Sequence, residues 1–271
     1  MATSYASDPA PVRWGLRIVT VGYVFLLVAW PTALVFKNAL ANGFGAMFET
    51  FSDPEIAHAI SLTLTITVWA VAINLVFGLT ISILLVRYDF PGKRALSAML
   101  DVPLAVSPVV VGLALILVYG SYAPAGGWLA RHGLQVIFSL PGMVLATVFV
   151  SLPLVVRAVV PVLRELGQDQ EEAAHTLGAT GWQTFVRITL PGIRAALGYG
   201  VVLCLARALG EYGAVAVVSG RLVGQTQTAT LFVEERYQNF DQTASYAVAT
   251  VLALIAVLIL LLTRVLRGRD G

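Results

Sequence analysis

Long apolar stretches alternate with short polar segments along the whole chain. A membrane-spanning α-helix needs about 20 mostly apolar residues to cross the hydrocarbon core, and six stretches reach that length. Open β-strands leave backbone groups unsatisfied in lipid, so these stretches are expected to be helical. The pattern predicts an all-α membrane protein with tails at residues 1–17 and 267–271, one transmembrane domain at 18–266, and six spans at about 18–36, 56–86, 95–120, 137–163, 192–220 and 242–263.

The first span admits a second interpretation as a secretory signal. Residues 39–41, Ala-Leu-Ala, imitate a signal-peptidase site. The apolar run before them has 19 residues, whereas the core of a signal peptide has about 7–15. We therefore expect the first span to stay in the mature protein as a transmembrane helix.

The composition supports lipid as the solvent. Hydrophobic residues make up 58% of the chain and charged residues 12%, and the mean hydropathy is +0.84. A soluble domain carries about a quarter charged residues. The net charge of +2 gives no indication of a nucleic-acid partner, and the lone cysteine, Cys204, lies in an apolar run where core packing is its expected role.

The distribution of Lys and Arg predicts the orientation, because cytoplasmic loops of membrane proteins are enriched in both. With the N-terminus inside, twelve basic residues fall on the cytoplasmic side and four outside, and Arg207 belongs to neither set. The external set is Lys37, Arg131, Arg221 and Arg236. The cytoplasmic set is Arg13, Arg17, Arg87, Lys93, Arg94, Arg157, Arg164, Arg187, Arg194, Arg264, Arg267 and Arg269. Both termini are therefore expected in the cytoplasm, together with the segment between the fourth and fifth spans.

That cytoplasmic segment has the polar pattern of two short helices. Asp169 followed by Glu172 has the spacing of a capping box, so a helix is expected at about residues 170–177, ending at Gly178. Thr180 and Gln183 repeat the pattern, and Pro191 suits the start of the fifth span. An apolar stripe would hold the two helices against the membrane domain: Trp182, Phe185 and Ile188. On these features alone, an amphipathic connector resting on the lipid headgroups is an equal alternative.

The same segment resembles the EAA loop of ABC importer permeases. The family pattern is E-A-A, three residues, G, nine residues and I-x-L-P. The matching positions here are Glu172, Ala173, Ala174, Gly178, Ile188, Leu190 and Pro191. The resemblance implies that residues 164–191, called here the EAA loop, form a coupling helix that docks in a groove of a separate ATPase subunit.

The resemblance extends over most of the chain. "FPGKRALSAMLDVPLAVSPVVVGL" and "ARALGEYGAVAVVSG" look like the CysW-type permease family of sulfate and thiosulfate importers. It implies a six-helix, MetI-like type I importer domain in the cytoplasmic (inner) membrane of a bacterium. It also implies three kinds of partner: a second sulfate permease subunit forming a heterodimer, two ABC ATPase subunits, and an extracytoplasmic sulfate-binding protein.

The chain lacks the motifs of an enzyme. It has no G-x-x-x-x-G-K-[ST] sequence for a nucleotide, so ATP and magnesium are expected on the partner ATPase, with no cofactor and no catalytic residue here. His58, His132 and His175 are scattered and do not suggest a metal site. The chain is therefore interpreted as a non-catalytic subunit.

Two charges lie inside the fifth span. Arg207 and Glu211 are spaced i, i+4, which places both on one face of a continuous helix. A charge in the membrane interior costs at least about 2.5–3.5 kcal/mol, which favours pairing or contact with water. Two hypotheses follow: a salt bridge that fastens span five to a neighbour, or a polar point on the translocation pathway or at its outer gate.

A second pair of charges is expected nearer the cytoplasm. Asp101 in span three and Arg157 in span four lie at similar depth, so they are expected to pair as a structural clamp or as part of the inner gate. Prolines in the same spans are expected to kink them: Pro103, Pro108, Pro153 and Pro161. The outer segment 220–241 would meet the binding protein through its Thr, Gln and acidic residues (Glu234, Glu235 and Asp241), or would be an ordinary solvated loop.

Three other functions remain open. A molybdate or tungstate permease shares an "ARALGE"-like stretch, and the composition does not separate one tetrahedral dianion from another. A secondary transporter or channel acting alone would not need an EAA loop. A structural membrane subunit without transport fits least, because it gives no reason for charges inside span five.

Overall fold

The computed structural model describes residues 10–41 and 43–267, and within these ranges every regular element is a helix. The all-α prediction is confirmed for that part of the chain. Residues 1–9 and 268–271 of the expected tails lie outside the described residues, as does Arg269. The first eight elements are α1 (Ala10–Val24), η1 (Phe25–Ala29), α2 (Trp30–Ala39), α3 (Gly43–Thr50), α4 (Pro54–Arg87), α5 (Lys93–Ala105), α6 (Pro108–Tyr119) and α7 (Pro124–Arg131). The remaining eight are α8 (Leu140–Leu166), α9 (Asp169–Thr176), α10 (Gly181–Thr184), η2 (Phe185–Thr189), α11 (Leu190–Leu209), α12 (Gly213–Val218), α13 (Ala229–Gln238) and α14 (Gln242–Arg267).

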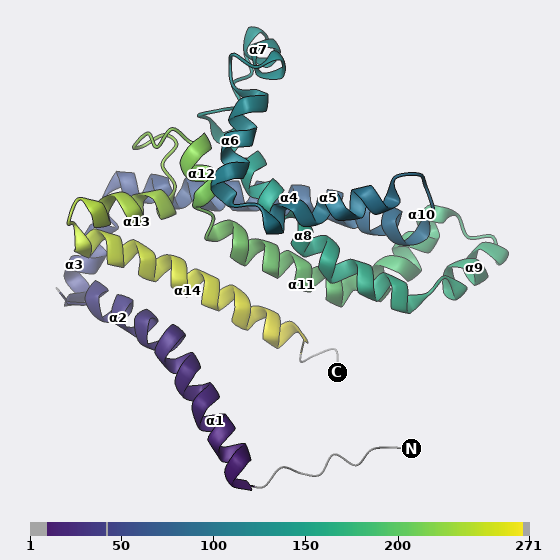
Figure 1. The fold of residues 1–271 in the computed structure, drawn as a ribbon, viewed down its shortest axis with the longest axis horizontal. Helices are drawn as coiled ribbons and strands as arrows, with labels where there is room; N and C mark the ends of the chain where they lie inside the picture. The colour runs from purple at the N-terminus through teal and green to yellow at the C-terminus, as the bar shows by residue number, and fades with distance from the viewer. Residues whose placement is uncertain (1–9, 42, 268–271) are drawn as a thin grey trace.

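Helices α4, α8, α11 and α14 run along one common direction in Figure 1, with α9 at one end of the molecule and α13 at the other. Five helical segments are long and apolar enough to cross a membrane, and a sixth span is possible if α5 and α6 count as one. The five are Val12–Ala39, Pro54–Arg87, Leu140–Leu166, Gly181–Leu209 and Gln242–Ile259. The EAA loop and the segment around α13 therefore lie at opposite ends of the spans.

The expected third span, residues 95–120, is not one continuous helix. Its two halves, α5 and α6, are bent by 116° at the break between them. Val106 and Ser107 are extended, with ψ of 139° and 135°, and Pro108 begins α6. A proline disfavours helical geometry in the residue before it and suits the first turn of a helix. Pro108 therefore ends one helix and starts another, while Pro103 lies inside α5.

The expected fifth span, 192–220, also differs. The helix starts at Gly181, so the second short cytoplasmic helix is continuous with the span, and it ends at Leu209. After a break at 210–212, α12 covers only Gly213–Val218. The start of α12 lies close to the start of α6, because a Cβ on Gly213 would lie 3.0 Å from Pro108 Cβ. The second halves of both interrupted spans, α6 and α12, thus pack on one another.

The core forms around α8, which packs against α4 and α11. Small residues permit this close approach. A Cβ on Gly78 of α4 would lie 2.8 Å from Val155 Cγ1, and one on Gly200 of α11 would lie 3.1 Å from Val155 Cα. Small residues are the usual means of close helix packing in lipid, where there is little hydrophobic drive between helices.

A buried polar contact joins the same three helices. The Asn74 side-chain amide of α4 donates to Ser151 Oγ of α8 at 2.8 Å and lies 3.4 Å from Cys204 Sγ of α11. All three side chains are buried. Cys204 therefore takes the core-packing role that its apolar surroundings predict.

The first span leaves this core. In Figure 1, α1 extends away from the other helices, while α2 contacts α14. None of the apolar window in Val12–Ala39 is buried within the chain. An apolar surface of this kind suits contact with the hydrocarbon of the membrane or with another subunit.

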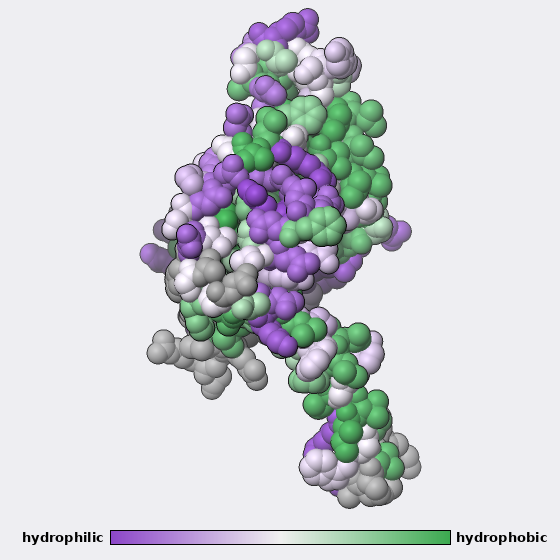
Figure 2. Space-filling model, turned by 90° about the vertical axis from the view of Figure 1, so that its left-hand side faces the viewer, coloured by the Kyte–Doolittle hydropathy of each residue, from purple (hydrophilic) through white to green (hydrophobic). Residues whose placement is uncertain are grey.

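The outer segment 220–241 is not the ordinary solvated loop that one hypothesis describes. It contains α13, whose Leu231 and Phe232 are each 1% exposed. The acidic residues expected at the rim bind within the chain instead: Glu234 pairs with Arg221, Glu235 with Gln227 and Asp241 with Arg236. Hydrophilic surface gathers on this end of the molecule, with hydrophobic surface at its sides (Figure 2).

Candidate functional site

The EAA loop folds as a helix, a tight turn and a second helix at one end of the spans. Its first helix, α9, starts at Asp169 with Gln168 as N-cap and no side-chain cap, so the expected Asp169 capping box is absent. The helix ends as expected at Gly178, which has φ +85°. Gly178 N donates to His175 O at 3.0 Å and Ala179 N to Ala174 O at 3.0 Å, the pair of bonds of a Schellman motif.

The turn leads directly into the second helix. Thr180 and Gln183 form the expected capping box, in which Gln183 N donates to Thr180 Oγ1 at 3.3 Å and Thr180 N to Gln183 Oε1 at 2.9 Å. From Gly181 the helix continues through the π-helical segment η2 into α11, and Pro191 follows directly after the start of α11. The second helix of the EAA loop is therefore continuous with span five, while α9 is joined to it through the turn at Gly178.

The motif residues divide between the surface and the bundle. Glu172, Ala173 and Gly178 are exposed, while Ala174, Ile188 and Leu190 are half-buried and Pro191 is exposed. Leu177 is 88% exposed and is the most prominent apolar side chain of the turn. The loop thus presents α9 and its turn to solvent, as a docking element requires.

The expected apolar stripe is only partly correct. Phe185 and Ile188 are half-buried, but Trp182 is 72% exposed and lies against Phe185 with ring centroids 5.6 Å apart. Trp182 therefore does not hold the loop against the membrane domain. Trp182 lies at the start of the helix that continues into span five, so its exposed indole is at the same end of the molecule as Leu177.

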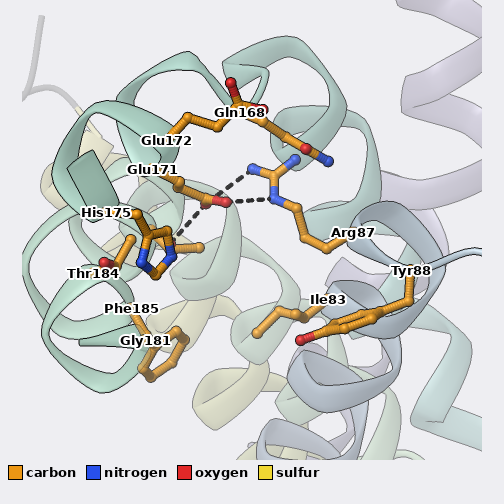
Figure 3. A pocket seen from close by; sticks show the side chains of 11 residues that line it. Ile83, Arg87, Tyr88, Gln168, Glu171, Glu172, His175, Gly181, Thr184 and Phe185 are labelled. Atoms are coloured by element: carbon orange, nitrogen blue, oxygen red, sulfur yellow. Dashed lines mark hydrogen bonds and ion pairs between the residues drawn. The ribbon is translucent and has the colours of Figure 1, made fainter. Parts of the chain in front are cut away.

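A pocket of about 490 Å³ lies between the EAA loop and the end of α4. Figure 3 shows Arg87 and Glu171 pointing toward one another in it. The Arg87 guanidinium pairs with the Glu171 carboxylate, with Nε 2.9 Å from Oε2 and Nη2 3.1 Å from Oε1. Thr189 Oγ1 donates to the same Oε1 at 2.8 Å. The residues that line the pocket are Ile83, Arg87, Tyr88, Gln168, Glu171, Glu172, His175, Gly181, Thr184, Phe185 and Thr189.

These three polar residues are missing from the expectations drawn from the sequence. Arg87 appears there only as one of twelve cytoplasmic cations, and Glu171, which directly precedes the motif, and Thr189 are not named. Arg87 and Glu171 are 84 residues apart, so no local spacing indicates that they meet. Two signals for this contact were present in the sequence: Arg87 is a basic residue at the end of a span, and Glu171 is an acid next to the motif.

The expected pair between spans three and four is present. Arg157 Nη2 lies 2.8 Å and Nε 3.2 Å from Asp101 Oδ1. The side chains are 59% and 58% exposed within this chain, so the pair lies on the surface of the bundle rather than in its core. Within this chain the pair joins α5 to α8.

The second expected pair is present with a different geometry. Arg207 Nη1 lies 2.9 Å from Glu211 Oε2, yet Glu211 lies beyond the end of α11 and not on a continuous helix. The Glu211 side chain is 2% exposed and that of Arg207 37% exposed. Glu211 Oε1 also accepts from Ala214 N at 3.0 Å. Glu211 thus lies in the break that divides span five and Arg207 in the last turn of α11 before it. Interrupted helices form binding sites in many secondary transporters.

The histidines remain apart from one another. His58 Nε2 lies 3.2 Å from Gln225 O, His132 Nδ1 2.8 Å from Trp128 O, and His175 Nδ1 3.1 Å from Ala179 O. No group of three or more His, Cys, Asp or Glu side chains suited to a metal ion occurs among residues 10–41 and 43–267.

Residues 74–269 match the family described as "Binding-protein-dependent transport system inner membrane component". The chain belongs to this family. The match covers the EAA loop and both interrupted spans, and the family's description agrees with the expected multi-pass location in the inner membrane.

Curated relatives of this chain are permeases. "Sulfate transport system permease protein CysW" of Escherichia coli (strain K12) is 46% identical over 266 residues, which are 97% of this chain and 91% of the relative. The CysW protein of Synechocystis sp. is 45% identical over 260 residues, 96% of this chain and 94% of the relative. "Sulfate transport system permease protein CysT" of Escherichia coli (strain K12) is 36% identical over 249 residues, 92% of this chain and 90% of the relative.

Solved structures share the fold. A chain of a bacterial alginate ABC transporter, in complex with alginate pentasaccharide-bound periplasmic protein, has a TM-score of 0.79 at 18% identity, covering 96% of this chain and 94% of that one. A chain of the MetNI methionine ABC transporter has a TM-score of 0.57 at 18% identity, and the match covers 79% of this chain and 95% of that one. The expected MetI-like type I importer fold is therefore confirmed, while the orientation of the termini stays a prediction.

Proposed function

We propose that this chain is the transmembrane permease subunit of an ATP-driven importer of sulfate, and of thiosulfate as a second substrate. The two CysW relatives, which carry sulfate in their names, match nearly the whole chain at 45–46% identity, which supports the choice of ion. The chain would work in the cytoplasmic membrane with both termini and the EAA loop inside.

The observation that carries this proposal is the form of the EAA loop. Seven motif positions are matched, and the chain folds there into an exposed helix with a left-handed glycine at its end and a prominent Leu177. A protein that transports alone has no use for such a projection. A docking groove on another subunit would cover the apolar side chain.

The partners follow from the same features. We infer a second permease subunit, two ABC ATPase subunits and an extracytoplasmic sulfate-binding protein. ATP and magnesium would be held by the ATPase subunits, and this chain would contribute no catalytic group. ATP binds the closed ATPase pair more tightly than the open one, and only that difference in affinity can shift the permease between its inward- and outward-open states.

The charged pairs are placed on the pathway in this proposal. Arg207 and Glu211 would form the outer polar point, because Glu211 lies in the break of span five and pairs with Arg207 at the end of α11. Asp101 and Arg157 would form the inner one. An arginine neutralised by a carboxylate attracts a dianion weakly, and weak binding suits passage because a deep energy well would retain the ion.

Cysteine crosslinking tests the docking step. Ala173→Cys or Ala174→Cys in the assembled complex is expected to crosslink to a co-expressed ATPase subunit through a bifunctional maleimide. Tyr122→Cys is the matched control, because Tyr122 is fully exposed in the turn between α6 and α7, away from the EAA loop. Crosslinking at Tyr122 that equals the crosslinking at Ala173 or Ala174, or no crosslinking at Ala173 and Ala174, would contradict the proposal.

Transport by the reconstituted complex tests the ion and the energy source. Labelled sulfate is expected to accumulate in vesicles only with ATP and the binding protein present. Accumulation without ATP would favour a secondary transporter, and preference for molybdate or tungstate over sulfate would favour the related oxyanion permeases.

A further inference from the structure

Arg87, the last residue of α4, connects two other elements, α8 and α9, through one guanidinium group. Its Nε and Nη2 pair with Glu171 of α9 at 2.9 and 3.1 Å. Its Nη1 donates to Leu163 O of α8 at 3.2 Å. A planar guanidinium can satisfy two acceptors in fixed directions, which a lysine ammonium does not reproduce.

The bond to Leu163 closes the end of α8. The last four carbonyl groups of an α-helix have no partner within the helix. Gly167 N, which would bond Leu163 O in a continuing helix, donates to Arg164 O at 3.3 Å instead. Arg87 supplies the missing donor and so fixes the cytoplasmic end of span four to that of span two.

Glu171 receives a further bond from span five. Thr189 is the last residue of the π-helical segment η2, and its hydroxyl donates to Glu171 Oε1 at 2.8 Å. Single π-helical turns inside α-helices are frequent at functional positions. One carboxylate on α9 is therefore bound from α4 and from η2, and through Arg87 it is linked to α8.

The backbone on either side of α9 has a glycine in a left-handed conformation. Gly167 has φ +66° and Gly178 has φ +85°. These glycines allow α9 to change direction relative to α8 and α10, so the backbone alone is a weak way to transmit its displacement. The polar contacts of Glu171 supply a direct side-chain connection that bypasses both glycines.

The pair is well shielded from water. The Arg87 side chain is 11% exposed and that of Glu171 19%, whereas the cytoplasmic pair between Lys93 and Asp89 has a carboxylate that is 98% exposed. Charge pairs screened from solvent interact more strongly than exposed ones. The neighbouring residue Glu172 is exposed, so adjacent acids on α9 face two different environments.

We propose that Arg87 and Glu171 are positioning residues that carry the displacement of α9 to the cytoplasmic ends of spans two, four and five. Glu172 and the turn at Leu177 face the ATPase, and Glu171 with Arg87 and Thr189 forms the connection to the spans. The inference rests on the proposed function, since it concerns how a docked ATPase moves this chain. It assigns the mechanical step to residues outside the seven motif positions.

The test measures coupling in the reconstituted complex of both permeases, the ATPase and the binding protein. Sulfate imported per ATP hydrolysed is compared for the unmodified chain, Glu171→Gln, Arg87→Ala and the double variant. We expect this ratio to fall about tenfold in each single variant, a size typical of coupling between sites. The double variant is expected to be no worse than Arg87→Ala, because both changes interrupt one connection.

Arg236→Ala is the matched control. Arg236 pairs with Glu55 at 2.8 Å at the opposite end of the molecule, so its loss is expected to leave the ratio unchanged. Thr189→Val removes one hydrogen bond to Glu171 at nearly constant volume and is expected to reduce the ratio less than Glu171→Gln does. If Arg87→Ala fails to assemble, Glu171→Gln and Thr189→Val decide the question.

The outcomes separate this inference from the proposed function. If the unmodified complex imports no sulfate with ATP, the proposed function fails. If the unmodified complex works and the Glu171→Gln complex keeps the same sulfate-to-ATP ratio, with only its amount or thermal stability lowered, the pair is merely structural and the inference is overturned. Continued ATP hydrolysis with little import in Glu171→Gln supports it.

Discussion

The carboxylate of Glu211 joins the two halves of span five: one oxygen lies 2.9 Å from Arg207 Nη1 and the other accepts from Ala214 N at 3.0 Å. Arg207 belongs to α11 and Ala214 to α12. The backbone O of Glu211 also accepts from Thr230 Oγ1 of α13 at 2.9 Å. Glu211, which lies in the break, therefore connects α11 and α12 to α13. The break is stabilised by these specific contacts.

Arg207→Ala is expected to abolish ATP-dependent sulfate uptake while leaving part of the complex assembled. The variant removes the only positive charge shown to pair with the buried Glu211 carboxylate among the described residues. Labelled sulfate uptake and co-purification of the ATPase measure the two effects. Arg221→Ala, which breaks an exposed outer pair with Glu234, is the control and should retain most uptake. Normal transport by Arg207→Ala would remove these residues from the pathway.

Glu211→Gln and Glu211→Ala are expected to differ in stability. Glutamine keeps an oxygen that accepts from Ala214 N, whereas alanine leaves that buried N–H without its acceptor, at a cost of about 1–3 kcal/mol. The midpoint of thermal unfolding in detergent should therefore fall further for alanine. Both variants lose the charge opposite Arg207, so both should lower uptake. Equal midpoints would show that the carboxylate does not hold the start of α12.

Gly112→Ala is expected to destabilise the contact between α6 and α12. The added Cβ would lie 2.8 Å from Ala214 O and 2.8 Å from Val217 Cβ, and overpacking of this kind costs about 1–3 kcal/mol. Gly198→Ala is the control, since a Cβ there meets nothing within 4 Å of this chain. Thermal unfolding of the two variants is compared, and an equal midpoint would contradict the close packing of the outer half-helices.

Leu177→Ser is expected to weaken binding of the ATPase without destabilising this chain. Leu177 is 88% exposed, so its side chain contributes little to the fold of the isolated subunit. Leu222→Ser, at a half-exposed position of the outer segment, serves as the control. Co-purification of the ATPase should fall only for Leu177→Ser, with both variants unfolding near the temperature of the unmodified chain. Undiminished co-purification would show that the turn of the EAA loop is not covered by the partner.

The helices themselves were predictable because lipid imposes one rule on every span. Residues 56–86 and 137–163 read as apolar runs, and the structure has helices at Pro54–Arg87 and Leu140–Leu166. The Thr180 capping box and the left-handed Gly178 were equally predictable, since each depends on a few adjacent residues.

The breaks were not predictable from hydropathy. Apart from the charges of Arg207 and Glu211, the residues around Ser107 and Gly210 are mostly apolar, so the hydropathy of the runs 95–120 and 192–220 does not show where the helices stop. Pro108 indicated a kink, but a bend of 116° needs the packing of α6 on α12 as well. The prediction that Trp182 packs on the membrane domain was wrong for a related reason. Helical spacing indicates which residues share a face of the helix, but not which neighbouring element packs on that face.

The contacts between distant residues divide in a similar way. Asp101 and Arg157 could be matched by depth, as charges in two adjacent spans. Arg87 and Glu171 lie in loop-proximal positions where many charges are available, and only the folded chain selects the pair. Charges are scarce within the spans, which restricts the possible pairs there, whereas the ends of the spans carry many charges.

The helix from Val12 to Ala39 buries none of its apolar window against the rest of the chain, and the family match begins only at residue 74. For the fold of this chain, the hydrophobic length of that window then matters more than the identity of any one of its side chains, whereas α2 keeps its contact with α14. A chimera that takes the window from a homologue and keeps this contact should still fold.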